Sequence, residues 1–160
     1  MAAGRRLPEQ GHVSKPTFLD PLLRKHTGAW ALVDAERGSV LAARVEPALD
    51  SNARRKGLLG REAIPDDYAL IIAPSNAVHT CFMRVPIDLV FVSRSGTVTK
   101  TSPGVRPWRV AGSLRAFAVI EAAAGFVDRH QIAPGNVVAL RDIPAVHRPE
   151  PNDRPLIDTE

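Results

Sequence analysis

The segment VHTCFMRVPIDLVFV, residues 78–92, carries the densest strand signal in the chain. Val, Ile, Phe and Thr are concentrated in it, and these residue types fit the pleated surface of a sheet. Within and just beyond it, we predict one strand over residues 77–83 and a second over 87–93, joined by Arg84, Val85 and Pro86. A β-rich fold is therefore built around this segment.

Further strands are expected on both sides of this pair. Turn residues and N-cap residues separate the apolar runs and set the expected ends of each element. The predicted strands cover residues 29–34, 39–45, 68–74, 77–83, 87–93, 97–101, 115–122 and 136–142, and short helices cover 53–59, begun by Asp50 and ended by Gly60, and 123–130. These eight strands and two helices predict an α+β, mainly β domain, with closure into a small barrel as the expected way to remove sheet edges.

The length of 160 residues favours one hydrophobic core, placed at residues 27–143. Residues 1–26 are interpreted as a flexible N-terminal tail, in which Phe18, Leu19, Leu22 and Leu23 are suited to dock as one short turn. Residues 144–160 are polar and rich in Pro, which predicts a disordered C-terminal tail.

Composition narrows the cellular setting. There is no apolar run long enough to span a bilayer, and no apolar segment follows the first basic residues, so a cytoplasmic location is expected. A single cysteine, Cys81, excludes an internal disulfide. The net charge of +4 favours anionic partners, but aromatic residues are too few to favour nucleic acid on this ground.

Several separated motifs agree in order and spacing with one known family. They are Arg55 to Arg61 (RKGLLGR), His79-Thr80-x-x-Met83, Pro86-Ile87-Asp88 running into Phe91, Pro107-Trp108-Arg109, Glu121 with Gly125, and Pro134-Gly135. In this pattern the chain resembles the small prokaryotic family numbered 192 in the domain-of-unknown-function series. Phe82 and Asn136 depart from it, where many relatives have Trp and Asp. The resemblance implies a compact β-rich α+β domain and leaves the activity open.

Polar residues within these motifs form the candidate ligand site. Arginines beside an aromatic ring, with neutral donors nearby, suit a carboxylate, a phosphate or a sugar oxygen. The candidate ligand-binding residues are His79, Thr80, Asp88, Trp108, Arg109 and Glu121. In the alternative interpretation, arginines pair with Asp88 and Glu121 to brace loops, and Trp108 covers one end of the core.

Two reactive arrangements are compatible with these residues, a Cys–His dyad and a metal site. On a regular strand His79 and Cys81 share a face, so the imidazole could activate the thiol, with Asp88 orienting it. A buried, inert cysteine is the more usual outcome. His79, Asp88, Glu121 and His130 are the metal-ligand candidates, but they are scattered and lack a local signature, so no metal and no cofactor is expected.

Three classes of function follow from these residues. The leading hypothesis is a domain that binds a small polar or anionic ligand, or a partner protein, through the six candidate residues. The second is a hydrolase or transferase with His79 as general base, oriented by Asp88 or Glu121; its catalytic residues are otherwise unknown. The third is nucleic-acid binding or regulation through the basic helix with Arg54, Arg55 and Lys56, together with Arg61.

Overall fold

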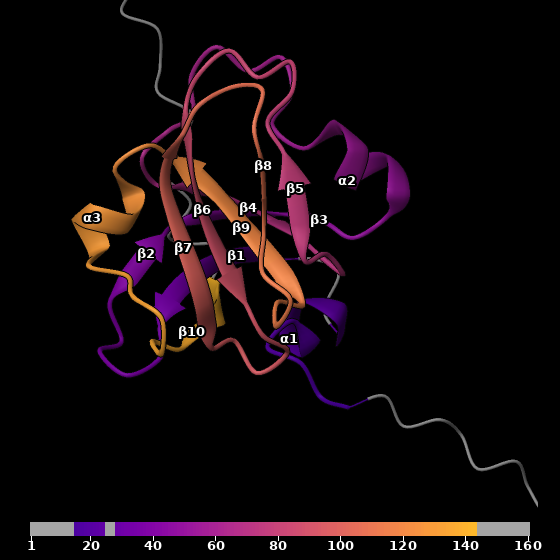
Figure 1. The fold of residues 1–160 in the computed structure, drawn as a ribbon. Coiled ribbons are helices and arrows are strands. Elements are labelled where there is room, and N and C mark those ends of the chain that lie inside the picture. The colour runs from indigo at the N-terminus through magenta and orange to yellow at the C-terminus, as the bar shows by residue number, and fades with distance from the viewer. Residues whose placement is uncertain (1–14, 25–27, 144–160) are drawn as a thin grey trace, which may run out of the picture.

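The computed structural model describes residues 15–24 and 28–143 (Figure 1). Most of the predicted N-terminal tail and the whole C-terminal tail, residues 1–14 and 144–160, lie outside the described residues, as do residues 25–27. No helix in the described ranges has the length and apolar character needed to cross a membrane.

Ten strands and three short helices make up the described part of the chain, which confirms the mainly β, α+β class. In chain order they are α1 (Asp20–Arg24), β1 (Ala29–Asp34), β2 (Val40–Ala42), β3 (Arg44–Ala48), α2 (Ser51–Lys56), β4 (Tyr68–Ile72), β5 (Ala77–His79), β6 (Ile87–Val92), β7 (Val98–Val105), β8 (Val110–Gly112), β9 (Ala118–Ala123), α3 (Phe126–His130) and β10 (Val138–Ile143).

The strands form three sheets and not a barrel. The main sheet has the order β3-β4-β9-β6-β7, a second has β10-β1-β2, and β5 pairs with β8. β3 runs parallel to β4, and the other neighbours in the main sheet are antiparallel. The predicted closure is wrong because β3 and β7 end the main sheet without pairing with each other. Pro47 in β3 and Pro103 in β7 instead limit the pairing capacity of these two edges.

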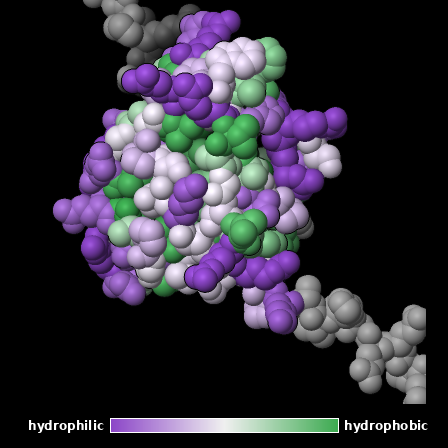
Figure 2. All heavy atoms as spheres, in the orientation of Figure 1, coloured by the Kyte–Doolittle hydropathy of each residue, from purple (hydrophilic) through white to green (hydrophobic). Residues whose placement is uncertain are grey.

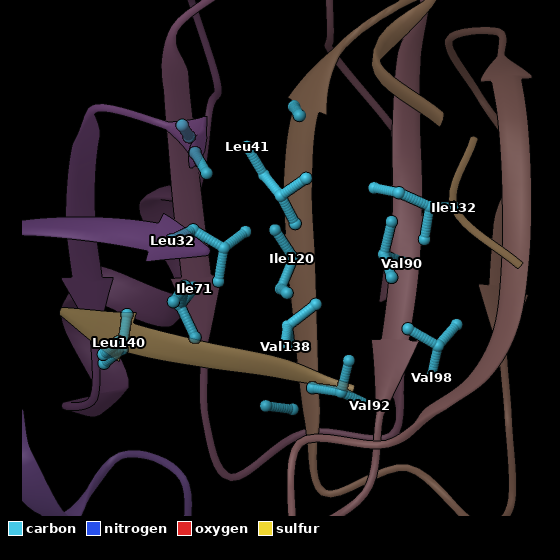
Figure 3. Packing of buried hydrophobic residues seen from close by; sticks show 14 of the residues in the cluster. Leu32, Leu41, Ile71, Val90, Val92, Val98, Ile120, Ile132, Val138 and Leu140 are labelled. Atoms are coloured by element: carbon cyan, nitrogen blue, oxygen red, sulfur yellow. The ribbon is translucent and has the colours of Figure 1, made fainter. Parts of the chain in front are cut away.

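A hydrophobic core lies between the main sheet and the second sheet. Figure 3 shows Leu32 and Leu140 from the second sheet facing Ile71, Ile120 and neighbouring side chains of the main sheet. Because side chains alternate along a strand, Ile120 points into this core while its neighbours on β9 point to the opposite face.

α1 belongs to the same core. Leu19 and Leu22 are buried in it, as the proposed docking turn requires. The predicted boundary between tail and domain at residue 26 therefore falls after a segment that already packs on the sheets.

A second core covers the other face of the main sheet. Leu70, Leu89 and Val119 point outward from this face and pack under Leu58 and Met83, which lie outside the strands. Residues after α2 and the segment around β5 thus cover the sheet, so its central strands are buried on both faces.

The largest departure from the predicted strands lies within the segment 78–92. β5 ends at His79, and the chain then turns, with Phe82 at φ 64°. Thr80 causes this turn: its N–H bonds to the carbonyl of Arg109, and its own carbonyl accepts from Met83 and Trp108. The strand predicted over 77–83 is therefore too long, and the alternation that placed His79 and Cys81 on one face does not apply.

Candidate functional site

Glu121 is a buried acid in the middle of the main sheet. It lies on β9, between Leu70 of β4 and Leu89 of β6, and its side chain is only 4% exposed. Its register places it on the face of the second core, which is otherwise apolar. An ionisable group in such surroundings needs a partner, a proton or a ligand.

No group in the described residues bonds to the Glu121 carboxyl. Burial alone raises the pKa of this carboxyl to about 7, with no neighbouring charge or donor lowering it. No described polar side-chain atom is both sealed from solvent and unpaired, so the Glu121 oxygens must open onto accessible space. One of them, Oε2, lies under Gly57, 3.6 Å from the position that a Cβ would occupy there.

That space is a pocket of about 600 Å³ between α2, β5 and the main sheet, here called the α2–β5 pocket. Its volume suits a small organic molecule. The lining residues are Ser51, Arg54, Arg55, Lys56, Gly57, Leu58, Leu59, Ile72, Ser75, Ala77, Val78, His79, Met83 and Glu121. Glu121 is thus the one acidic group among the lining residues, and the rest combine basic, small and apolar side chains.

α2 supplies the positive charge of the pocket. Asp50 begins this helix by accepting hydrogen bonds from the N–H groups of Asn52 and Ala53, as predicted, and these bonds lower the pKa of the Asp50 carboxyl. The helix ends at Gly57 rather than at Gly60. That end brings Lys56 and the two arginines before it to the rim.

The α2 cations form no direct ion pair within the described ranges, although Arg54 lies close enough to Asp50, and Lys56 to Glu46, to help lower the pKa of these two carboxyls. The Arg54 guanidinium donates to the Leu49 carbonyl at 2.5 Å, and Arg55 donates to Asn52 Oδ1 at 2.6 Å. The ion pairs within the described ranges involve other arginines. The rim therefore carries three cations that are not held in direct ion pairs, and this excess of basic groups favours an anion.

Comparison with protein families gives the same family as the sequence motifs. The model of the family DUF192, described as "Uncharacterized ACR", matches residues 32–140. This chain belongs to the DUF192 family. The matched range includes α2, β5 and Glu121, so the α2–β5 pocket lies within the DUF192 domain.

Two solved structures share the fold of this DUF192 domain. One is provisionally described as a transcription regulator, from Sinorhizobium meliloti 1021, with a TM-score of 0.61 and 23% identity over 71% of this chain and 91% of that one. The other is a protein of unknown function from Novosphingobium aromaticivorans DSM 12444, with a TM-score of 0.59 and 24% identity over 68% and 81%. No curated protein matches the chain. At these identities the likeness shows the fold alone.

Of the six residues predicted to bind a ligand, the DUF192 domain places two in the pocket, His79 and Glu121. His79 lies at the end of β5, opposite Val110 of β8, and is exposed. Their roles remain predictions, but their common location narrows the candidate site to these two residues and the α2 cations.

Asp88 and Thr80 are occupied by structural hydrogen bonds. Asp88 is fully buried and accepts from the N–H groups of Gly104 at 2.7 Å and Val127 at 2.8 Å, which joins β7 and α3 to β6. Thr80 Oγ1 donates to the Arg106 carbonyl and accepts from the Arg109 N–H. The alternative in which arginines pair with Asp88 and Glu121 is wrong, since Asp88 bonds to backbone and Glu121 to no described group.

Trp108 and Arg109 lie outside the lining of the pocket, in the exposed loop before β8. Trp108 does not cover the core: it is 58% exposed, and its ring packs at a tilt against that of Phe82. The Arg109 guanidinium donates to the carbonyl of Trp108.

The reactive arrangements gain no support. Cys81 is half-buried in the turn after β5 and is not in the pocket lining. In residues 15–24 and 28–143 no three His, Cys, Asp or Glu side chains gather in a metal-binding group.

The sequence did not reveal that α2 covers Glu121. The signals that could have indicated it were the motif RKGLLGR and a lone acid in the apolar run VIEAAA.

Proposed function

We propose that this DUF192 domain binds a small anionic molecule in the α2–β5 pocket, with its charged group at the α2 rim and a polar group at Glu121. The observation that carries this is the Glu121 carboxyl, buried and unpartnered at the base of a pocket with a basic rim. A buried polar group without a partner destabilises the fold, and a ligand that bonds to it removes this cost.

The raised pKa of Glu121 allows this acid to accompany an anion. Near neutral pH about half of the carboxyl groups are protonated, and a neutral carboxyl donates a hydrogen bond to a carboxylate or phosphate oxygen. An anion bound nearby raises the pKa further, so binding takes up a proton. Affinity is therefore expected to fall as the pH rises above about 7.

The test is a titration of the full chain with inorganic phosphate, phosphate monoesters and short carboxylates, by thermal shift and then calorimetry. Substitution of Arg55→Gln with Lys56→Gln is expected to weaken binding of the best ligand at least roughly tenfold, since the loss of even one charged contact costs about 1.5–3 kcal/mol. Arg94→Gln with Lys100→Gln, which lie outside the pocket, serves as the matched control.

Glu121→Gln tests the role of the proton. The amide keeps a hydrogen-bond donor at this position at every pH. The variant is therefore expected to bind at pH 6 and, unlike the unaltered chain, to bind equally well at pH 8. If neither the rim variant nor Glu121→Gln changes the affinity for the ligand, the α2–β5 pocket is not the binding site.

A second candidate function, acid–base catalysis, has one observation in its favour. His79 and Glu121 line the same pocket, and a carboxyl with a pKa of about 7 suits proton transfer at neutral pH. The ligands found above are also followed for chemical conversion by NMR. Conversion that His79→Ala abolishes would support an enzyme, and unchanged ligands would support a binding domain.

A further inference from the structure

Two aromatic side chains are exposed to solvent at one end of the molecule. Phe82, in the loop between β5 and β6, is 69% exposed, and Trp108, in the loop between β7 and β8, is 58% exposed. Their ring centroids are 4.6 Å apart, and Val110, two residues after Trp108, is 77% exposed. Figure 1 shows both loops at the top of the view, and in Figure 2 this end carries apolar and strongly hydrophilic residues side by side.

The backbone that presents these rings is in an unfavourable conformation. Phe82 has φ 64° and Trp108 has φ 62°, the left-handed region that large side chains seldom adopt. Core packing does not explain either conformation, because both rings are exposed. Residues held in this way are concentrated at binding and switch sites.

Thr80 fixes the two loops to each other. This buried residue bonds to the backbone of Arg106, Trp108 and Arg109, and also to Met83 next to Phe82. The aromatic pair is therefore presented by a hydrogen-bonded frame and does not depend on its own packing. A preorganised apolar surface loses little conformational entropy when a partner binds.

The charged residues next to Trp108 are basic, whereas Arg84 near Phe82 is paired with Glu62. Between Asp88 and Glu121 the sequence contains no Asp or Glu, and its basic residues are Arg94, Lys100, Arg106, Arg109 and Arg115. Arg106 and Arg109 flank Trp108, are exposed and take part in no ion pair within the described residues. A partner of complementary charge is acidic.

We propose that Phe82, Trp108 and Val110, flanked by Arg106 and Arg109, form a docking surface for an acidic segment of another protein that carries apolar side chains. Aromatic and Arg residues are enriched where apolar anchors dock in protein interfaces. None of these five residues lines the α2–β5 pocket, so this proposal is independent of the proposed ligand.

The geometry of the rings favours a protein segment over single-stranded nucleic acid. Bases stack on open, flat aromatic faces. Here the two ring planes are tilted by 60°, and each ring covers part of the other. The tilted pair with Val110 instead offers an uneven apolar surface, suited to a Leu or Phe side chain.

The test exposes the immobilised full chain to a randomised pool of short peptides in which Asp or Glu alternates with Leu, Phe or Trp. The best binder is labelled, and its affinity is measured by anisotropy. Phe82→Gly with Trp108→Gly, and separately Arg106→Gln with Arg109→Gln, are each expected to weaken binding at least tenfold. Glycine tolerates the positive φ of both positions, and thermal unfolding verifies that the variants fold.

Matched controls come from the other end of β8. Leu114→Ser removes an apolar side chain that is 98% exposed, and Arg115→Gln removes an exposed cation. Both are expected to bind like the unaltered chain, and a pool with Ser in place of the apolar residues is expected not to bind. The proposal is overturned if no peptide saturates the chain, if both loop variants bind normally, or if oligothymidine displaces the peptide and depends on the same residues.

Discussion

Two buried acids of the main sheet show how different the fate of one residue type can be. Asp88 on β6 and Glu121 on β9 lie one register step apart and point to opposite faces. Asp88 accepts two backbone N–H groups, whereas Glu121 has no described partner and opens onto the α2–β5 pocket. The sequence placed both in one candidate site because the donors of Asp88 come from segments far along the chain.

Asp88→Asn tests the structural role of the first acid. Asparagine keeps the size but turns one acceptor oxygen into a donor group that faces an N–H, so one buried hydrogen bond is lost. We expect the free energy of unfolding, measured with urea, to fall by about 2–3 kcal/mol. Asp66→Asn removes only an exposed ion pair with Arg129 and is expected to change it by less than about 1 kcal/mol. If the two variants lower the free energy of unfolding equally, the proposed structural role of Asp88 is contradicted.

At the scale of the element, the loops that carry Phe82 and Trp108 are held by Thr80 and not by the rings. Trp108→Gly relieves a positive φ and loses one exposed ring contact, effects of about 1 kcal/mol each with opposite sign. We therefore expect a change in unfolding free energy within about 1 kcal/mol. Phe126→Ala, in the first core, is expected to cost about 3–5 kcal/mol in the same urea measurement. A comparable loss for Trp108→Gly would show that this ring supports the fold.

Elements with an unambiguous local pattern were predicted well. The centres of β1, β4, β6 and β9 are apolar runs bounded by turn residues, and each lies within or close to its predicted range. The strands β3 and β8 were missed because β3 contains Pro47 and β8 has three residues that pair only with β5.

Where an element ends was harder to predict. The N-cap Asp50 is confirmed because its hydrogen bonds are local. The C-terminal end was assigned to Gly60 but lies at Gly57, and both glycines have a positive φ, so local chemistry does not choose between them. β5 ends early because Thr80 bonds to residues of the β7–β8 loop, which no local pattern contains.

For the whole molecule, the sequence predicted the family and the fold class but not how the sheets combine. Short alternating strands are compatible with a barrel and with packed sheets, because closure depends on the pairing of edges that lie far apart in the sequence. The same applies to the site: α2 meets Glu121 only through the second core, where Leu58 packs on the main sheet.

The pocket also makes the stability of the whole chain depend on pH. The pKa of Glu121 is about 7 in the folded chain and near 4.5 for an ordinary Glu, so the folded state holds this proton more tightly. The stabilisation by this proton is complete below about pH 4.5 and is lost as the pH rises through about 7. The full difference corresponds to about 3 kcal/mol.

Urea unfolding of the unaltered chain and of Glu121→Gln between pH 4.5 and pH 8 tests the claim on which the proposed function depends, that this carboxyl is buried without a partner. We expect the unaltered chain to lose about 3 kcal/mol relative to Glu121→Gln over this range, with most of the loss between pH 5 and pH 7. A difference between the two chains that stays constant with pH would contradict the claim and remove Glu121 as the polar centre of the α2–β5 pocket.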